Sequence, residues 1–130
     1  MLKEEDKAAI VKYRIDRAFT AFDEAKEVAQ LKRWTLVANR LYYSVFYMAS
    51  ALLVKNDIVT KSHSGTMHLF GEQFVKSGKV DKTYGQLYTK LFQMRQSGDY
   101  DDMFDIKEDA IVPYIERVDV FLHTISKLIN

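Results

Sequence analysis

The segment RQSGDYDD, residues 95–102, places a cation, a tyrosine and three carboxylates close together. A guanidinium presents a planar fork of donors that suits a phosphate, and a tyrosine hydroxyl can add a further contact. Arg95 and Tyr100 are therefore candidates to bind a nucleotide or nucleic-acid phosphate, with Gln96 and Asp99 beside them. A structural interpretation stays open, because a cation near a helix C-terminus complements the helix dipole and can pair locally with Asp99.

A second polar group lies in the segment from residue 34 to residue 55, which is otherwise apolar almost all round. A helix of that kind must be buried on several sides, so its polar positions stand out. These positions form a narrow stripe: Asn39, Arg40, Tyr43, Ser44, Tyr47 and Ser50. We expect Asn39, Arg40 and Tyr43 to border the same cleft as Arg95.

Other kinds of chemistry find little support. The chain has no cysteine, and His63 and His68 lie five residues apart, which is not the spacing of a helical zinc pair. We expect His63 to be a loop residue that binds no metal. Neither a nucleophile elbow nor a phosphate-binding glycine loop is present. The sequence therefore predicts neither a metal site nor a cofactor.

Charge is unevenly distributed along the chain. The net charge of the whole chain is +1. From Asp99 to Asp119 there are eight acids and two bases, which gives −6 and leaves +7 on the remaining residues. A phosphate-binding surface should therefore lie away from this acidic segment.

No segment has the length and composition of a membrane span or a signal peptide. The longest apolar stretch, VFYMASALLV, is far shorter than the roughly 20 residues that cross a bilayer. The start, MLKEEDKAAI, lacks the apolar core of a secretion signal. We expect a cytoplasmic protein with no membrane association.

Apolar residues recur at steps of three and four, which predicts helices, and no segment alternates like a strand. We expect a single domain over residues 1–130 with an all-α fold, an antiparallel helical bundle of about five helices. The expected helices cover residues 5–31 and 34–55, a short third one ending near Gly78, a fourth that Asp81 caps, and a last one around residues 111–128. Gly98 is expected to end the fourth helix and turn Asp99 and Tyr100 back toward Arg95.

Three blocks of sequence resemble one known family. They are ANRLYYSVFYMASALL from Ala38, KSHSGTMHLFGEQFVKSG from Lys61, and RQSGDYDD from Arg95. Together they resemble the HEPN domain, in particular its small stand-alone prokaryotic branch with the patterns A-N-R-x-Y-Y-x-x-F, K-x-H-x-G and R-x-x-x-D-Y. The resemblance implies a helical bundle that usually forms dimers.

The resemblance also implies a set of functions. Many HEPN proteins are metal-independent ribonucleases, often toxins encoded beside a minimal nucleotidyltransferase. Their motif is an arginine, a polar residue, and a histidine a few positions further along. Arg95 and Gln96 match this motif, but Tyr100, Asp101 and Asp102 occupy the positions where the histidine is expected. A tyrosine with a pKa near about 10 is a poor general base at neutral pH.

Two hypotheses follow, and whether the protein is an enzyme stays open between them. The first is a module that binds a nucleotide, RNA or a partner, without strong catalytic activity, paired with a minimal nucleotidyltransferase in a toxin–antitoxin type system. The alternative is a metal-independent ribonuclease toxin that uses Arg95 and Tyr100. In related pairs the nucleotidyltransferase attaches AMP to a motif tyrosine, and Tyr100 is the matching position. We also expect a homodimer that buries part of residues 34–55 or of the adjoining fourth helix, because residues 34–55 are apolar on more faces than one small bundle would cover.

Overall fold

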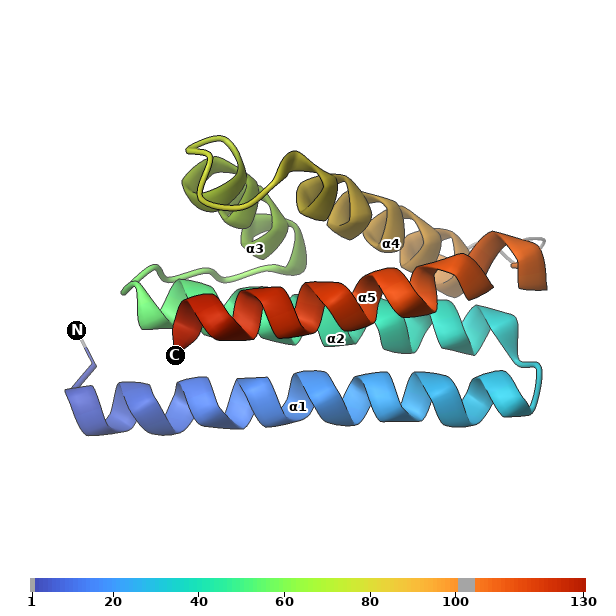
Figure 1. The fold of residues 1–130 in the computed structure, drawn as a ribbon, viewed down its shortest axis with the longest axis horizontal. Coiled ribbons are helices and arrows are strands. Elements are labelled where there is room, and N and C mark those ends of the chain that lie inside the picture. The colour runs from blue at the N-terminus through green and yellow to red at the C-terminus, as the bar shows by residue number, and fades with distance from the viewer. Residues whose placement is uncertain (1, 101–104) are drawn as a thin grey trace.

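The computed structural model describes residues 2–100 and 105–130, except for the side chains of residues 99 and 100. Over these ranges the chain forms helices and no strand (Figure 1). The elements are α1 (Glu4–Gln30), α2 (Trp34–Lys55), α3 (His63–Phe70), a π-helical turn η1 (Gly71–Val75), α4 (Lys82–Tyr100) and α5 (Glu108–Ile129). The all-α bundle predicted from the apolar periodicity is thereby confirmed.

Helix α2 lies at the centre of this bundle. It packs against α1, α3, α4 and α5. Figure 1 shows α1 antiparallel to α2, and α5 running beside α2 in the same direction. The buried side chains of α2 come from nearly all round the helix: Val37, Ala38, Leu41, Tyr42, Ser44, Val45, Met48, Ala49, Ser50, Ala51, Leu52 and Leu53. Their burial in an apolar core is the main stabilising term of the fold.

The exposure of the apolar side chains of α2 bears on the expected homodimer. Among large apolar side chains of α2, Leu36 in the first turn is exposed, at 42%. The other large apolar side chains of α2 are buried or half-buried. Most of the apolar surface of α2 is thus buried within one chain, and the homodimer stays a prediction.

The starts of α3 and α4 are set by side-chain caps. The Asp81 carboxylate accepts hydrogen bonds from the backbone N–H of Thr83 at 3.0 Å and from its hydroxyl at 2.6 Å, as a capping residue should. In the same way Ser62 caps α3, because its hydroxyl accepts from the Gly65 N–H at 2.9 Å. His63 is consequently the first residue of a helix, and the prediction that it lies in a loop is wrong.

Gly98 does not end the fourth helix, because α4 continues to Tyr100. A Cβ added at Gly98 would lie 3.0 Å from Cγ2 of Thr35, in the first turn of α2. The glycine therefore allows close approach of α4 to α2 instead of a turn. The expected return of Asp99 and Tyr100 toward Arg95 concerns side chains that lie outside the described residues.

Candidate functional site

Arg95 reaches from α4 to α2. Its Nη2 donates a hydrogen bond to Oη of Tyr43 at 3.1 Å, a contact between residues 52 positions apart. Its Cζ lies 5.7 Å from the centroid of the Tyr42 ring and 5.6 Å from that of Tyr43, within the range of cation–π attraction. These contacts fix a half-buried guanidinium on two neighbouring tyrosines, and they bring together the two polar segments singled out in the sequence.

Tyr43 also contacts a second guanidinium. The Cζ of Arg40 lies 5.1 Å from the centroid of the Tyr43 ring. Nε and Nη2 of Arg40 donate to Oδ1 of Asn39 at 3.1 Å and 2.8 Å, and Nη1 lies 3.2 Å from a Glu24 carboxylate oxygen. Arg40 is therefore partly neutralised by Glu24 and oriented by Asn39, while its other face rests on the ring that holds Arg95.

The structure brings four of the predicted site residues together. Arg95, Tyr43, Arg40 and Asn39 form one continuous set of contacts. Gln96 lies exposed on α4. The side chains of Asp99 and Tyr100 lie outside the described residues, so the pairing of Arg95 with Asp99 and the position of the Tyr100 hydroxyl stay predictions.

His63 is a member of this site that the sequence did not reveal. Its Nδ1 lies 3.0 Å from Oη of Tyr42. Its ring stacks on Phe46, with centroids 4.5 Å apart, and meets Tyr43 edge-on at 5.7 Å. We call Tyr42, Tyr43, His63 and Arg95 the Arg95 cluster. The signal for His63 was its place in the K-x-H-x-G block, a pattern that does not say which residues surround the imidazole.

Two groups of the Arg95 cluster have shifted acidities. Burial lowers the pKa of His63, and the positive charge of Arg95 lowers it further. Burial raises the pKa of Tyr42 well above its ordinary value, against the opposing effect of Arg95. At neutral pH the imidazole is therefore uncharged and the Tyr42 hydroxyl keeps its proton.

Basic and aromatic side chains extend from this cluster toward α1. The Cζ of Arg17 lies 5.3 Å from the centroid of the Tyr47 ring. Arg14 donates to the hydroxyl of Ser50, which is buried. A hollow of about 270 Å³ lies here, and its described lining includes Arg14, Lys61 and His63 but no carboxylate. An anion in this hollow would meet cations from α1 and from the segment before α3.

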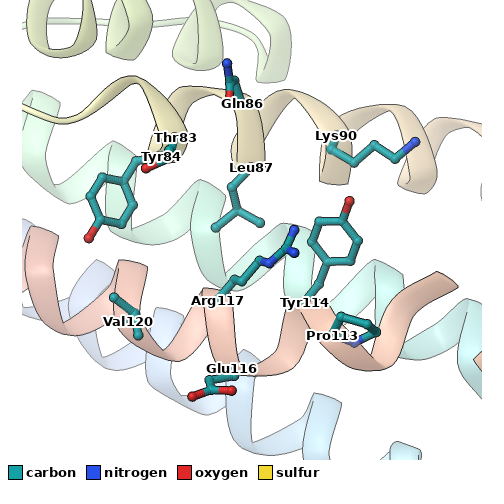
Figure 2. Close-up of a pocket in the computed structure, with 10 residues that line it drawn as sticks. All are labelled: Thr83, Tyr84, Gln86, Leu87, Lys90, Pro113, Tyr114, Glu116, Arg117 and Val120. Atoms are coloured by element: carbon teal, nitrogen blue, oxygen red, sulfur yellow. The ribbon is translucent and has the colours of Figure 1, made fainter. Parts of the chain in front are cut away.

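A separate groove of about 910 Å³ lies between α4 and α5. Figure 2 shows Leu87 of α4 pointing toward Arg117 of α5, with Tyr114 beside them, whereas Glu116 points away. The Cζ of Arg117 lies 5.0 Å from the centroid of the Tyr114 ring. None of the predicted site residues lines this groove. Arg117 is thus an arginine that rests on a tyrosine ring outside the Arg95 cluster.

No group of three or more histidine, aspartate or glutamate side chains in residues 2–100 and 105–130 is placed to hold a metal ion. In the same ranges no helix combines the length and apolar character that crossing a bilayer requires.

The fold and the site together describe a small all-α protein with a polar site between helices, where an arginine rests on two tyrosines near a histidine. A family model described as HEPN domain matches residues 11–128. A protein named UPF0332 protein from Thermotoga maritima is 36% identical over 125 residues, which cover 96% of this chain and 95% of that relative. The chain therefore belongs to the HEPN domain family, as its three sequence blocks indicated.

Two further relatives carry names that refer to toxins. Both come from Methanocaldococcus jannaschii. The protein named "Putative toxin MJ0142" is 26% identical over 87% of this chain and 77% of its own length. The protein named "Putative toxin MJ0605" is 30% identical over 82% of this chain and 78% of its own length. The chain is thus similar to toxin-named members of the family.

Proposed function

We propose that this protein is a toxin-type HEPN module that binds the phosphate of a nucleotide or RNA at the Arg95 cluster. The observation that carries this proposal is the guanidinium of Arg95, held half-buried by the hydroxyl of Tyr43 and by two aromatic rings. A guanidinium fixed in this way loses less side-chain entropy when it binds a phosphate. The neighbouring Arg40 and Tyr43 would then contact the rest of the ligand, with Asn39 orienting Arg40.

A variant of Arg95 tests the proposed site. Arg95→Ala should weaken the binding of AMP or single-stranded RNA at least tenfold, while the melting temperature changes little. The matched control is Arg117→Ala, because Arg117 also rests on a tyrosine ring but lies on α5 in the other groove. Affinity is measured by calorimetry or fluorescence anisotropy, and stability by circular dichroism. A lower melting temperature with unchanged affinity would show that Arg95 has only a structural role.

We further propose that the protein works with a minimal nucleotidyltransferase in a toxin–antitoxin type pair. The family resemblance and the names of two relatives support this proposal. Tyr100 is the candidate for modification by AMP, because it stands at the tyrosine position of the R-x-x-x-D-Y block. Incubation with ATP and a nucleotidyltransferase encoded beside its gene should add the mass of AMP, and Tyr100→Phe should prevent this. Addition of AMP to the Tyr100→Phe protein would exclude Tyr100 as the modified residue.

The expected assembly and location belong to the same proposal. A homodimer is implied by the resemblance, and α5 offers exposed apolar side chains in Val112, Val120 and Leu128. Light scattering at tens of micromolar should then give twice the 15.2 kDa mass of one chain. A single-chain mass would remove the dimer. We propose that the protein acts in the cytoplasm, where RNA and nucleotides are abundant.

A further inference from the structure

His63 and Arg95 approach the same two aromatic rings from different helices. The ring centroid of His63 lies 6.0 Å from that of Tyr42 and 5.7 Å from that of Tyr43. The Cζ of Arg95 lies 5.7 Å and 5.6 Å from the same two centroids. The first residue of α3 and the last turns of α4 therefore bring an imidazole and a guanidinium to one place on α2.

We infer the tautomer of the imidazole from its hydrogen bond to the buried hydroxyl of Tyr42. Tyr42 is fully buried and keeps its hydroxyl proton, because burial raises its pKa. That hydroxyl can donate to Nδ1 of His63, which lies 3.0 Å away. A neutral imidazole that accepts at Nδ1 carries its proton on Nε2. His63 therefore has an N–H donor available for a ligand.

The charges around His63 are positive. Arg95 faces it from α4, while Arg14 of α1 and Lys61 share the hollow that His63 borders. The other titratable groups that face it are the tyrosines of α2, Tyr42, Tyr43 and Tyr47. Among these described neighbours there is no carboxylate. No negative charge in this set balances a positive imidazolium, so a bound anion would be the group that does so.

We propose that His63 and Arg95 form one phosphate-binding site, in which His63 becomes protonated when the phosphate binds. This inference rests on the proposed function and deepens it. The negative charge of the phosphate offsets the repulsion between the two cations, and the Tyr42 hydroxyl keeps its hydrogen bond by accepting from Nδ1–H instead of donating. The positive charges of Arg95 and His63 then both act on the ligand. They attract a terminal phosphate with two negative charges, as in a nucleoside monophosphate or at a 5′-phosphorylated RNA end, more strongly than an internal phosphodiester with one.

The test follows the protonation of His63 in the wild-type protein. Its imidazole ring protons are titrated by nuclear magnetic resonance without and with saturating AMP, and are identified by their loss in His63→Gln. We expect AMP to raise the pKa of His63 by at least one unit. An unchanged or lowered pKa in the AMP complex would overturn the proposal, and this readout needs no variant that must fold.

Affinity measurements supply the second readout. His63→Gln should weaken AMP binding at least fivefold slightly below neutral pH. Because this variant lacks the imidazole, the pH dependence of its AMP binding corrects for the ionisation of AMP. The matched control is His68→Gln, an exposed histidine of the same helix, which should bind AMP as the wild type does. A 5′-phosphorylated RNA oligonucleotide should bind at least fivefold more tightly than the same oligonucleotide with a 5′-hydroxyl.

The outcomes separate this inference from the proposed function. If Arg95→Ala weakens AMP binding but His63→Gln does not, the shared site is refuted and the Arg95 site stands. If the 5′-hydroxyl oligonucleotide binds as tightly as the phosphorylated one, the preference for a terminal phosphate is refuted. If neither AMP nor RNA binds, or Arg95→Ala binds them as the wild type does, the proposed function itself fails.

Discussion

Tyr42 and Tyr88 allow the hydrogen bond to His63 to be measured against a control in the same core. Both side chains are fully buried, and their ring centroids lie 6.3 Å apart. The Tyr42 hydroxyl bonds Nδ1 of His63 at 3.0 Å, whereas the Tyr88 hydroxyl has no hydrogen-bond partner among the described residues. Replacing each tyrosine by phenylalanine removes one oxygen and nearly nothing else.

The two replacements should have different effects on stability. Tyr42→Phe removes a hydrogen bond and leaves a half-buried nitrogen of His63 unsatisfied, which costs about 1–2 kcal/mol. Tyr88→Phe removes a buried hydroxyl that has no described partner, so stability should be unchanged or rise by up to about 1 kcal/mol. With an unfolding entropy of about 2.1 cal/mol/K per residue, a chain of 130 residues loses about 4–7 °C in melting temperature for Tyr42→Phe.

Thermal and urea unfolding followed by circular dichroism measure this difference. The pKa of His63 gives a second check, because Tyr42 stabilises the neutral imidazole by donating to it, and Tyr42→Phe should therefore raise that pKa. Equal destabilisation by the two replacements would refute the assigned hydrogen bond. A lowered pKa of His63 in Tyr42→Phe would show that Nδ1 donates instead of accepting.

Two further predictions concern stability. Because the folded-state pKa of His63 lies below the unfolded value near 6.5, the unfolded chain binds more protons between these two values. The resulting contribution to the free energy of unfolding is fully present above about pH 7 and is lost as the pH falls through the folded-state pKa. The urea midpoint should therefore fall with pH in this range. His63→Gln should remove this pH dependence, and His68→Gln should retain it. Gly98→Ala should gain helix propensity, but its new Cβ would lie 3.0 Å from the Thr35 methyl group. Thr35→Ser removes that methyl group. The effect of Gly98→Ala on the free energy of unfolding should therefore be more favourable in the Thr35→Ser background than in the wild type, by several tenths of a kcal/mol to about 1 kcal/mol. Equal effects of Gly98→Ala in both backgrounds, measured by urea unfolding, would contradict the close contact.

The sequence was sufficient for features that depend on local pattern. The bounds of α2 agree with the predicted range because its apolar run is long and is broken by polar segments at both ends. Asp81 was identified as a cap because capping depends on residues two or three positions away. Both features arise within a few turns of chain, where a single sequence carries the needed information.

Features that depend on packing were missed or only partly predicted. Gly98 has the appearance of a helix stop, but its role is set by Thr35 of another helix. Arg95 and Tyr43 were expected to border one cleft, but the hydrogen bond that joins them spans 52 positions and follows from no local pattern. The loop predicted at His63 is wrong because the Ser62 hydroxyl caps α3 there. The partners of Arg95 and His63 are chosen by how α3 and α4 meet α2, which no local pattern encodes.

The tautomer of His63 bears on the choice between a binding module and a ribonuclease. A general base needs a bare nitrogen at the ligand, but a His63 that accepts from Tyr42 at Nδ1 carries a proton on Nε2. That arrangement donates to a phosphate and is unsuited to removing a proton from a ribose hydroxyl. We therefore expect purified protein to bind RNA and leave it intact in the presence of a metal chelator. RNA cleavage that is abolished by both Arg95→Ala and His63→Gln, and retained by His68→Gln, would show that His63 takes part in the reaction and would favour the ribonuclease.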